Sequence, residues 1–506
     1  MKRRSPNLLI LLADDLGYGD VGCQNPDARI PTPCIDRLAR EGVRATDAHA
    51  PASVCSPTRY GLLTGRYAWR GRLPRGVVAP WGPPILEEDR PNLATLLRDH
   101  GYATGCFGKW HLGWDWPTID GKPPKGVQEG PTNVNFRRRI GGGPTDRGFD
   151  TYFGVDLPNF PPYCYIEQDR TVGIPTRHVV REGQINRPGP IIDGWRQEDI
   201  LPTVTSRACA WIDAQVAADR PFFAYVPLSS PHYPLVPSAA WRGRTKVGEY
   251  GDFVAQTDHH VGEILSALGK AAEDTLVIFT SDNGPEPGEV AVGAYERIFQ
   301  YGHDGRGGLR GVKRDNWEGG HRVPFVARWP GKLRPGSVVR GTLNLLDIPA
   351  MMAGMLDVAL PDDAFEDAFD CLPVLRGGES ERRRAGSVHA KASGSFALRL
   401  GEWVLIDSPS GNDNGRGEPA SLAPPAHGQP VELFHLPSDP AQRRNRAAEE
   451  PARVRAMRRR LEEIRRSGRT RGRSSAPCSI TSAARDSCTW VRSAPPWPAC
   501  GWVARC

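Results

Sequence analysis

The sequence predicts an α/β fold: a large mixed, mostly parallel sheet flanked by helices, with a smaller C-terminal α+β subdomain. The chain has 506 residues, which is too long for one small domain. Apolar, β-rich runs recur along its first two thirds, and most are nearly continuous rather than alternating, as expected for strands covered on both faces. Helical stretches lie between these runs, which is typical of a parallel sheet.

The predicted elements alternate along the chain. The predicted strands are 7–13, 102–108, 222–228, 275–281 and 323–329. The predicted helices are 33–41, 91–100, 203–217, 252–268 and 345–356. The segment 114–200 is rich in Pro, Gly, Trp and Arg and has weak periodicity, so we expect a long surface excursion that forms a pocket rim.

The pattern changes at about residue 371. Residues 396–400 and 403–407 predict a hairpin that turns at Gly401 and Glu402, 431–436 predicts a further strand, and 452–466 predicts an amphipathic helix. We therefore expect a catalytic domain over 1–370, a small subdomain over 371–470 and a tail over 471–506. The tail contains four of the eleven cysteines and matches no regular element, which indicates either disorder or out-of-frame translation.

The basic charge is local. The formal net charge is +7, but residues 442–473 contain thirteen Arg, no Lys and four Glu, so the rest of the chain is slightly acidic. We interpret this segment as a solvated, Arg-rich helix and expect no nucleic-acid partner.

The cysteines and the N-terminus bear on the compartment. Eleven scattered cysteines with no CxxC pair do not indicate a zinc ribbon, a thioredoxin-like site or a disulfide framework. No apolar run is long enough to span a membrane, and two aspartates directly follow the short apolar run 8–12, unlike the end of a signal peptide. We expect a cytoplasmic protein as encoded, or a periplasmic or secreted one if the true start lies upstream.

Oxygen-bearing side chains follow two of the predicted strands. Asp14 and Asp15 come directly after the first strand, and Asp282 and Asn283 follow the strand 275–281. In open α/β sheets, ligands bind at the carboxyl ends of the strands. Oxygen ligands favour a hard cation, Ca²⁺ or Mg²⁺, over zinc. Taken singly, each pair could also be a helix cap or an ordinary turn.

A twelve-residue string begins at Cys55 and reads CSPTRYGLLTGR. Pro57 suits the first turn of a helix, which would place Cys55 at the helix N-terminus, where the dipole favours a negative oxygen or a sulfate. The short pattern C-x-P-x-R alone carries a high risk of chance occurrence, whereas the full string is far more specific.

This string resembles the signature of the sulfatase family, whose cysteine is oxidised to formylglycine (3-oxoalanine) by a separate enzyme. Lys313 and five further segments match in order: 13–20 (ADDLGYGD), 108–113 (GKWHLG), 230–234 (SPHYP), 281–284 (SDNG) and 317–324 (WEGGHRVP). The resemblance covers roughly residues 5–465. It implies the fold of the alkaline phosphatase superfamily and an arylsulfatase-like sulfuric ester hydrolase.

Several residues have chemistry that suits a sulfate ester. Arg59, Lys109 and Lys313 supply fixed cations that can neutralise the ester, and Arg grips sulfate oxygens bidentately. His111 and His232 can transfer protons near neutral pH. Any one of these side chains alone would be unremarkable in a protein of this size. Their occurrence together makes them candidate catalytic residues.

The resemblance implies a mechanism with defined roles. Formylglycine at position 55 is hydrated to a gem-diol. A divalent metal activates one hydroxyl of this gem-diol, and the resulting oxygen attacks sulfur. The metal is held by Asp14, Asp15, Asp282, Asn283 and residue 55. Asp282 assists the deprotonation of that hydroxyl. His232 and Lys313 contact the sulfate, and one of them protonates the leaving alcohol. His111 deprotonates the second hydroxyl, which expels sulfate, while Arg59 and Lys109 hold the gem-diol.

The resemblance also implies the partners: Ca²⁺, with Mg²⁺ as an alternative, an aryl sulfate or sulfated carbohydrate as substrate, and a formylglycine-generating enzyme during maturation. The sequence departs from the family at residues 314–316 (RDN), where small polar residues are more usual. Two other functions stay open. One is a phosphonate monoester hydrolase or phosphodiesterase that uses the same formylglycine, and the other is a non-catalytic binder of sulfated glycans with an unmodified Cys55.

Overall fold

The computed structural model describes residues 5–125, 132–185, 187–288, 292–377, 384 and 386–472. The described residues up to 471 form one compact unit. The expected tail, 471–506, lies outside the described residues from 473 onward, and the division between residues 370 and 371 stays a prediction.

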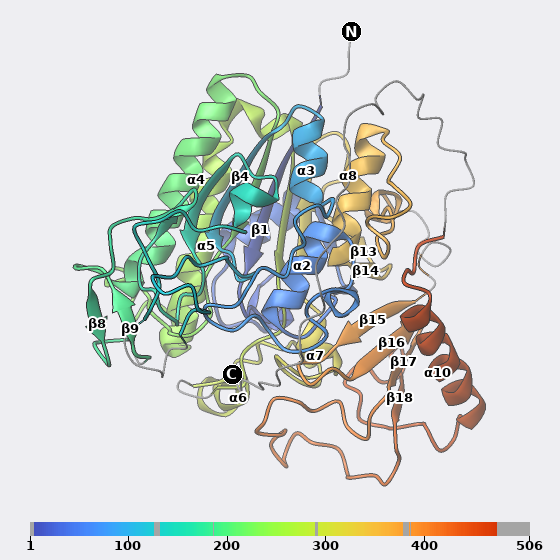
Figure 1. Ribbon diagram of the computed structural model, residues 1–506. Helices are drawn as coiled ribbons and strands as arrows, with labels where there is room; N and C mark the ends of the chain where they lie inside the picture. The colour runs from blue at the N-terminus through green and yellow to red at the C-terminus, as the bar shows by residue number, and fades with distance from the viewer. Residues whose placement is uncertain are drawn as a thin grey trace. The chain divides into compact units, whose positions relative to one another are not determined.

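A ten-stranded mixed sheet forms the core (Figure 1), in the order β13-β2-β12-β11-β1-β10-β4-β5-β6-β7. The strands from β11 through β1, β10 and β4 to β5 are parallel, and β12 runs antiparallel to β11. Its strands are β1 (Asn7–Ala13), β2 (Val43–Ala45), β4 (Ala103–Lys109), β5 (Thr151–Val155), β6 (Ile166–Glu167), β7 (Arg170–Thr171), β10 (Phe222–Pro227), β11 (Thr275–Ser281), β12 (Phe325–Arg328) and β13 (Ser337–Val339).

Helices cover both faces of this sheet, which explains the continuous apolar runs. Leu8, Ile10 and Leu12 of β1 belong to one core, whereas Leu9 and Leu11 belong to the other. Helices α4 and α5 lie on one side, and α2, α3 and α8 lie on the other (Figure 1). The helices are α1 (Pro33–Glu41), α2 (Cys55–Thr64), α3 (Leu93–Asp99), α4 (Ile200–Ala217), α5 (Gly248–Ala267), α6 (Ala294–Tyr301), α7 (Glu318–His321), α8 (Ile348–Leu356), α9 (Leu372–Leu375) and α10 (Pro451–Arg466).

A four-stranded antiparallel sheet follows the core, in the order β15-β16-β17-β18, and α10 packs on β16 and β17. Its strands are β15 (Ser387–Ala390), β16 (Phe396–Leu400), β17 (Trp403–Ile406) and β18 (Glu432–His435). Two small pairs complete the structure: β3 (Ala48–His49) with β14 (Leu343–Asn344), and β8 (Arg177–Val179) with β9 (Gly189–Ile191).

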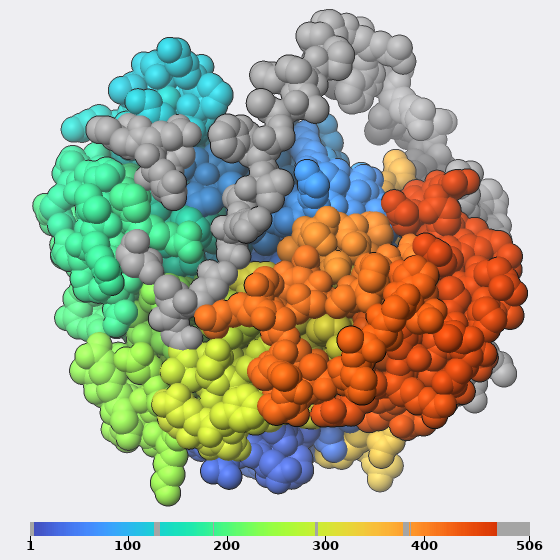
Figure 2. Space-filling model, turned by 90° about the horizontal axis from the view of Figure 1, so that it is seen from below, coloured from blue at the N-terminus to red at the C-terminus, as the bar shows by residue number. Residues whose placement is uncertain are grey.

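The C-terminal sheet is joined to the segment 315–317 by buried contacts. Trp317 packs with Val404 and Phe434, and its indole N–H donates to Glu432 Oε2 over 2.9 Å. Asp315 accepts hydrogen bonds from the segment after β17. One of them comes from the backbone N of Asp413 over 2.7 Å. Viewed from below in Figure 2, the orange and red C-terminal part accordingly lies beside the yellow segment around residue 300.

The predicted fold class is confirmed, and one expectation was wrong. The segment 114–200 is not only a surface excursion, because it contributes β5, a buried strand that pairs in parallel with β4. The predicted hairpin 396–407 and the predicted helix 452–466 correspond to β16–β17 and α10. Two strands at the other end of the sheet, β2 and β13, are only three residues long and were not predicted.

Two further findings concern cysteines and membranes. The seven cysteines of the described chain are all free thiols rather than disulfides. No helix among the described residues combines the length and the apolar character that crossing a membrane requires.

Candidate active site

Four oxygen-bearing side chains meet at the carboxyl ends of β1 and β11. These strands pair in parallel up to their last residues, so Asp14 and Asp282 emerge at the same edge of the sheet. The backbone N of Asp15 donates to Asp282 Oδ1 over 3.2 Å, and Asn283 Nδ2 donates to Asp15 Oδ1 over 2.8 Å. All four residues are buried. The predicted grouping of these acids and amide is therefore present.

Asp15 has a backbone conformation that the sequence did not predict. Its φ of +65° lies in the left-handed region, which is uncommon for a residue other than glycine. Neighbouring side chains of a strand point to opposite faces, and this conformation ends that alternation. Both carboxylates consequently approach Cys55: Sγ lies 3.6 Å from Asp14 Oδ1 and 4.0 Å from Asp15 Oδ1.

Cys55 is the first residue of α2, as predicted, and Arg59 follows one turn later. Residues four apart share a helix face, so both side chains point toward the acids. Arg59 Nη2 lies 2.7 Å from Asp282 Oδ2 and 3.3 Å from Asp14 Oδ1. A third hydrogen bond, from Arg59 Nη1 to the carbonyl of Lys109 over 3.0 Å, fixes the guanidinium.

The two predicted lysines each pair with one of the adjacent aspartates. Lys109, the last residue of β4, places Nζ 2.8 Å from Asp14 Oδ2. Lys313, in the loop before α7, places Nζ 2.7 Å from Asp15 Oδ2. Both lysines are buried, so their charges are held in a medium of low dielectric constant. The cluster thus combines three carboxylates with three fixed cations.

The two predicted histidines border the cluster differently. His232 Nε2 lies 3.7 Å from Asp15 Oδ2. His111 has no direct contact with the acids, but its Nε2 lies 3.1 Å from the carbonyl of Val78. If that nitrogen donates, Nδ1 carries a lone pair, and Nδ1 is buried without a hydrogen-bond partner. His111 therefore has a nitrogen that is able to accept a proton.

Comparison with known proteins gives the family. The family model described as Sulfatase matches residues 6–358, which is more than half of the chain and includes all ten predicted site residues.

This chain belongs to the sulfatase family.

Its relatives agree with this assignment. The sulfatase is 30% identical to an N-acetylgalactosamine-6-O-sulfatase of Bacteroides thetaiotaomicron, over 91% of this chain and 93% of the relative. It is 31% identical to human arylsulfatase A, over 87% and 83% of the two chains. A solved structure from work on glycosaminoglycan metabolism by B. thetaiotaomicron superimposes with a TM-score of 0.76 and 29% identity, covering 91% of this chain and 99% of that one. The protein is thus an arylsulfatase-like enzyme that hydrolyses sulfate esters.

The electrostatics of the sulfatase site separate two of its carboxylates. Burial opposes the ionisation of Asp14, but Lys109, His232 and Arg59 outweigh it and hold the pKa of Asp14 well below its ordinary value. Burial and the neighbouring charge of Asp14 raise the pKa of Asp282 to about 7. In the absence of further cations, Asp282 is therefore harder to ionise than Asp14.

The thiol of Cys55 is a poor nucleophile as it stands. Burial and the charge of Asp282 raise its pKa well above the ordinary value, so the thiol stays protonated at neutral pH. The thiolate is the reactive form of cysteine. An unmodified Cys55 therefore lacks the reactivity that a catalytic cysteine normally shows.

The residues of the site fit a hard cation. Asn283 Oδ1 is a buried oxygen without a hydrogen-bond partner. Ligand atoms of Asp14, Asp15, Cys55 and His232 lie within 4.8 Å of one another. Buried polar atoms normally have a partner, so this unpaired oxygen beside the carboxylates indicates a place for a ligand. The donors are mainly carboxylate and amide oxygens, which favours Ca²⁺ or Mg²⁺.

Sequence reasoning missed Glu286, which borders the sulfatase site. Its Oε2 lies 3.2 Å from Lys313 Nζ, and its Oε1 accepts from Arg314 over 2.9 Å. Lys313 and Arg314 outweigh the effect of burial and lower the pKa of Glu286 to about 2. Glu286 follows the predicted 281–284 motif by two residues, but nothing in its neighbours PEP marks it as a charged partner. The unusual Arg314 is thus paired within the site wall.

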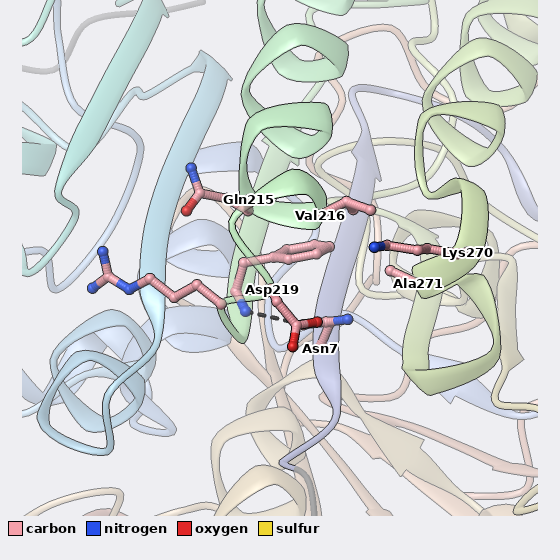
Figure 3. Close-up of a pocket in the computed structure, with 8 residues that line it drawn as sticks. Asn7, Gln215, Val216, Asp219, Lys270 and Ala271 are labelled. Atoms are coloured by element: carbon pink, nitrogen blue, oxygen red, sulfur yellow. Dashed lines mark hydrogen bonds between the residues drawn. The ribbon is translucent and has the colours of Figure 1, made fainter.

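A small cavity of about 120 Å³ lies away from these residues (Figure 3). Asn7 at the start of β1, Asp219 just after α4 and Lys270 just after α5 line it. Asn7 Oδ1 accepts from the backbone N of Phe222 there, over 3.1 Å. Since Asp14 follows the opposite end of β1, this cavity is not part of the sulfatase site.

Proposed function

We propose that this sulfatase removes sulfate from a sulfated carbohydrate and that Cys55, oxidised to formylglycine, carries the reaction. The observation on which the proposal rests is the position of Cys55, at the N-terminus of α2 and within 4.0 Å of Asp14 and Asp15. The helix N-terminus and the cations Arg59, Lys109 and Lys313 favour a negatively charged group at this place.

The modification supplies what the thiol lacks. A hydrated aldehyde at position 55 offers one hydroxyl as nucleophile and a second through which the aldehyde is regenerated. Asp14, Asp15, Asp282 and Asn283 would hold Ca²⁺, or Mg²⁺, which contributes charge neutralisation and Lewis acidity when bound. The unpaired Asn283 Oδ1 supports this assignment.

The three buried cations are assigned to two tasks, orienting the group at position 55 and binding sulfate. Lys109 and Arg59, fixed by Asp14 and Asp282, orient the group at position 55. Lys313 lies on the side of Asp15 and is available to bind sulfate oxygens. A preorganised donor of this kind is typically worth roughly 3 kcal/mol in the transition state.

The two histidines are assigned different roles. Burial lowers the pKa of His232 and, together with Lys109, that of His111. Both rings are therefore neutral near pH 7. We assign His111 Nδ1, which has no hydrogen-bond partner, to the removal of a proton from the group at position 55. Lys313, whose ammonium stays protonated at neutral pH, is assigned to protonate the leaving alcohol. His232, beside Asp15, is assigned to contact the sulfate.

The assignment of a carbohydrate substrate rests on sequence similarity to a relative with that activity in its name. The relative that is named N-acetylgalactosamine-6-O-sulfatase covers 91% of this chain. An aryl sulfate is the second candidate, because arylsulfatase A covers 87% at about the same identity. Arg314 and Glu286, paired beside Lys313, form a charged wall that suits a polar substrate.

The experiment that tests the proposal uses protein co-expressed with a formylglycine-generating enzyme. Wild type and Cys55→Ala are compared in Ca²⁺ buffer on a chromogenic aryl sulfate and on sulfated N-acetylhexosamines, and mass spectrometry measures the aldehyde at position 55. We expect the wild type alone to release sulfate, with a higher kcat/KM on the sugars. Equal turnover by Cys55→Ala would refute the role of Cys55, and a preference for the aryl ester would refute the carbohydrate assignment.

A further inference from the structure

Three buried histidines form a second cluster, apart from the residues described above. They are His49 of β3, His321 at the end of α7, and His389 of β15, and none is more than 1% exposed. His49 Nδ1 and His321 Nδ1 are 3.1 Å apart. The rings of His321 and His389 stack with their centroids 4.0 Å apart. One ring nitrogen of each histidine lies within 4.8 Å of one nitrogen of the other two.

The outer nitrogen of each ring faces an oxygen that can only accept a hydrogen bond. His49 Nε2 lies 2.8 Å from a carboxylate oxygen of Asp47. His321 Nε2 lies 3.2 Å from the carbonyl of Asn316, and His389 Nδ1 lies 2.9 Å from the carbonyl of Ala50. Because carbonyl and carboxylate oxygens accept hydrogen bonds, each of these nitrogens carries a proton.

The inner nitrogens are therefore lone-pair donors. His389 Nε2 is buried without a hydrogen-bond partner. His49 Nδ1 and His321 Nδ1 are 3.1 Å apart, which is unfavourable for two lone pairs unless a proton or a metal ion lies between them.

We propose that His49, His321 and His389 form a buried binding site for a divalent transition-metal ion, with zinc as the first candidate. Neutral imidazole nitrogens prefer zinc and its neighbours in the first transition row over Ca²⁺ or Mg²⁺. The outer contacts match the usual support of metal-binding histidines, whose second nitrogen donates to a carboxylate or a backbone carbonyl. This site is separate from the oxygen site of Asp14 and Asp15 and does not depend on the proposed reaction.

The spacing of His49 and His321 suits zinc, whereas the His389 ring has to move. Two Zn–N bonds of about 2.0–2.1 Å that span 3.1 Å enclose an angle of about 100°, near the tetrahedral value. The rings of His321 and His389 are only 6° from parallel, so their lone pairs do not converge. Coordination therefore requires the His389 ring to tilt away from the stack.

The site would act as a structural link. His49 lies close to Cys55 in sequence, His321 lies in the 317–324 motif, and His389 belongs to the C-terminal antiparallel sheet. An ion held by all three would tie this sheet to the two segments that carry Cys55 and Lys313. Metal binding of this kind contributes directly to folding free energy, so the expected role is stabilisation.

Metal content and spectroscopy test the proposal. Full-length protein is expressed with zinc in the medium, dialysed into Ca²⁺ buffer, and analysed for zinc by mass spectrometry. We expect about one zinc per chain in the wild type and in Cys55→Ser, and a loss of at least five-fold in His389→Gln and His49→Gln. Co²⁺ added to metal-free wild type should give a visible absorption band that zinc abolishes.

A matched control and a folding check accompany these variants. His303 is also fully buried and pairs with Asp20, but it lies outside the cluster, so His303→Gln should keep its zinc. Far-UV circular dichroism identifies any variant that fails to fold. For the wild type, added zinc should raise the melting temperature of the metal-free protein, and this measurement does not depend on any variant.

Two results would overturn the proposal. In one, the wild type contains no zinc, gives no Co²⁺ band and melts at the same temperature with and without zinc, so that a shared proton between His49 and His321 accounts for their contact. In the other, zinc is present but persists in His389→Gln and disappears in Cys55→Ser, which would place the ion in the oxygen site instead.

Discussion

At the scale of single residues, the site is defined by ion pairs between buried groups rather than by exposed reactive side chains. Lys109 and Lys313 each hold one of two adjacent aspartates, and Arg59 bridges Asp14 and Asp282. Buried charges are costly unless they are paired, and the loss of one partner leaves the other uncompensated. Substitutions here should therefore change both activity and stability.

Lys313→Ala should lower kcat/KM about 100-fold, because it removes one preorganised donor worth roughly 3 kcal/mol. It also removes the lysine partner of Asp15 and leaves Glu286 paired with Arg314 alone. Steady-state kinetics on the preferred sulfate ester gives the measurement. Lys332→Ala, at an exposed position, serves as the control and should behave like the wild type. An unchanged kcat/KM in Lys313→Ala would exclude a direct role for this lysine.

His111 should determine the acid limb of the pH profile. Burial, Lys109 and Arg59 lower its pKa below the ordinary 6.5, so the ring is neutral and able to accept a proton at neutral pH. Activity that needs this neutral form is retained as the pH falls past 6.5 and is lost only when the pH falls through the lowered pKa. In a plot of kcat/KM against pH, this limb should be present in the wild type and absent from the residual activity of His111→Ala. A wild-type limb above pH 6.5 would contradict the assignment.

Some of these features could be predicted from residue types alone, and others could not. Nine of the ten candidate residues lie in short sequence motifs, and Lys313 was found only through the resemblance to the sulfatase family. The sequence does not show which lysine pairs with which aspartate, since Lys109 and Asp14 meet only through the strand order β1-β10-β4. Nor does it show Glu286, or the left-handed conformation of Asp15.

At the scale of elements, strand β4 places its catalytic lysine through a glycine. Gly108 has φ of +137°, and a Cβ atom there would lie 1.9 Å from the carbonyl oxygen of Pro227 in the paired strand β10. A side chain at this position would push β4 away from β10. The position of Lys109, the next residue, depends on this close approach.

Gly108→Ala should therefore destabilise the protein by roughly 3 kcal/mol, at the upper end of the cost of overpacking, and should reduce activity. Gly101→Ala is the matched control, since Gly101 also has positive φ (+85°) but has open space around its Cα. It should cost only about 1 kcal/mol through backbone strain and leave kcat unchanged. Urea denaturation and kinetics of both variants give the comparison. Equal destabilisation would show that the contact with Pro227 is unimportant.

The elements that were predicted well share one property. Strands such as β1 and β11 are covered by helices on both faces, so their continuous apolar runs stand out. Strand β5 was missed because it is only five residues long and lies in a Gly- and Pro-rich segment. Strands β2 and β13 are too short for their apolar content to form a pattern.

At the scale of the whole molecule, the bound cation should contribute to stability as well as to activity. Asp14, Asp15 and Asp282 are three buried carboxylates from segments far apart in the chain. A ligand that binds only the folded state stabilises it by mass action. Chelation should therefore affect the global fold.

EDTA should abolish sulfate ester hydrolysis and lower the melting temperature, and Ca²⁺ should restore both. Cys55→Ala keeps the carboxylates, so its melting temperature should respond to Ca²⁺ although it is inactive. Asp282→Asn should weaken that response. Differential scanning calorimetry with and without Ca²⁺ provides the measurement. Full activity of rigorously metal-free enzyme would remove these residues from the proposed role.

The burial of Cys55 has a consequence for the order of events during synthesis. Cys55 is 2% exposed, and its charged neighbours Asp282 and Lys313 are added to the growing chain more than two hundred residues later. At translation rates of about 5–20 residues per second, this leaves an interval of roughly 10–50 s. A second enzyme that oxidises Cys55 would have to act within that interval. The yield of modified enzyme would then depend on whether oxidation is faster than folding of the chain around Cys55.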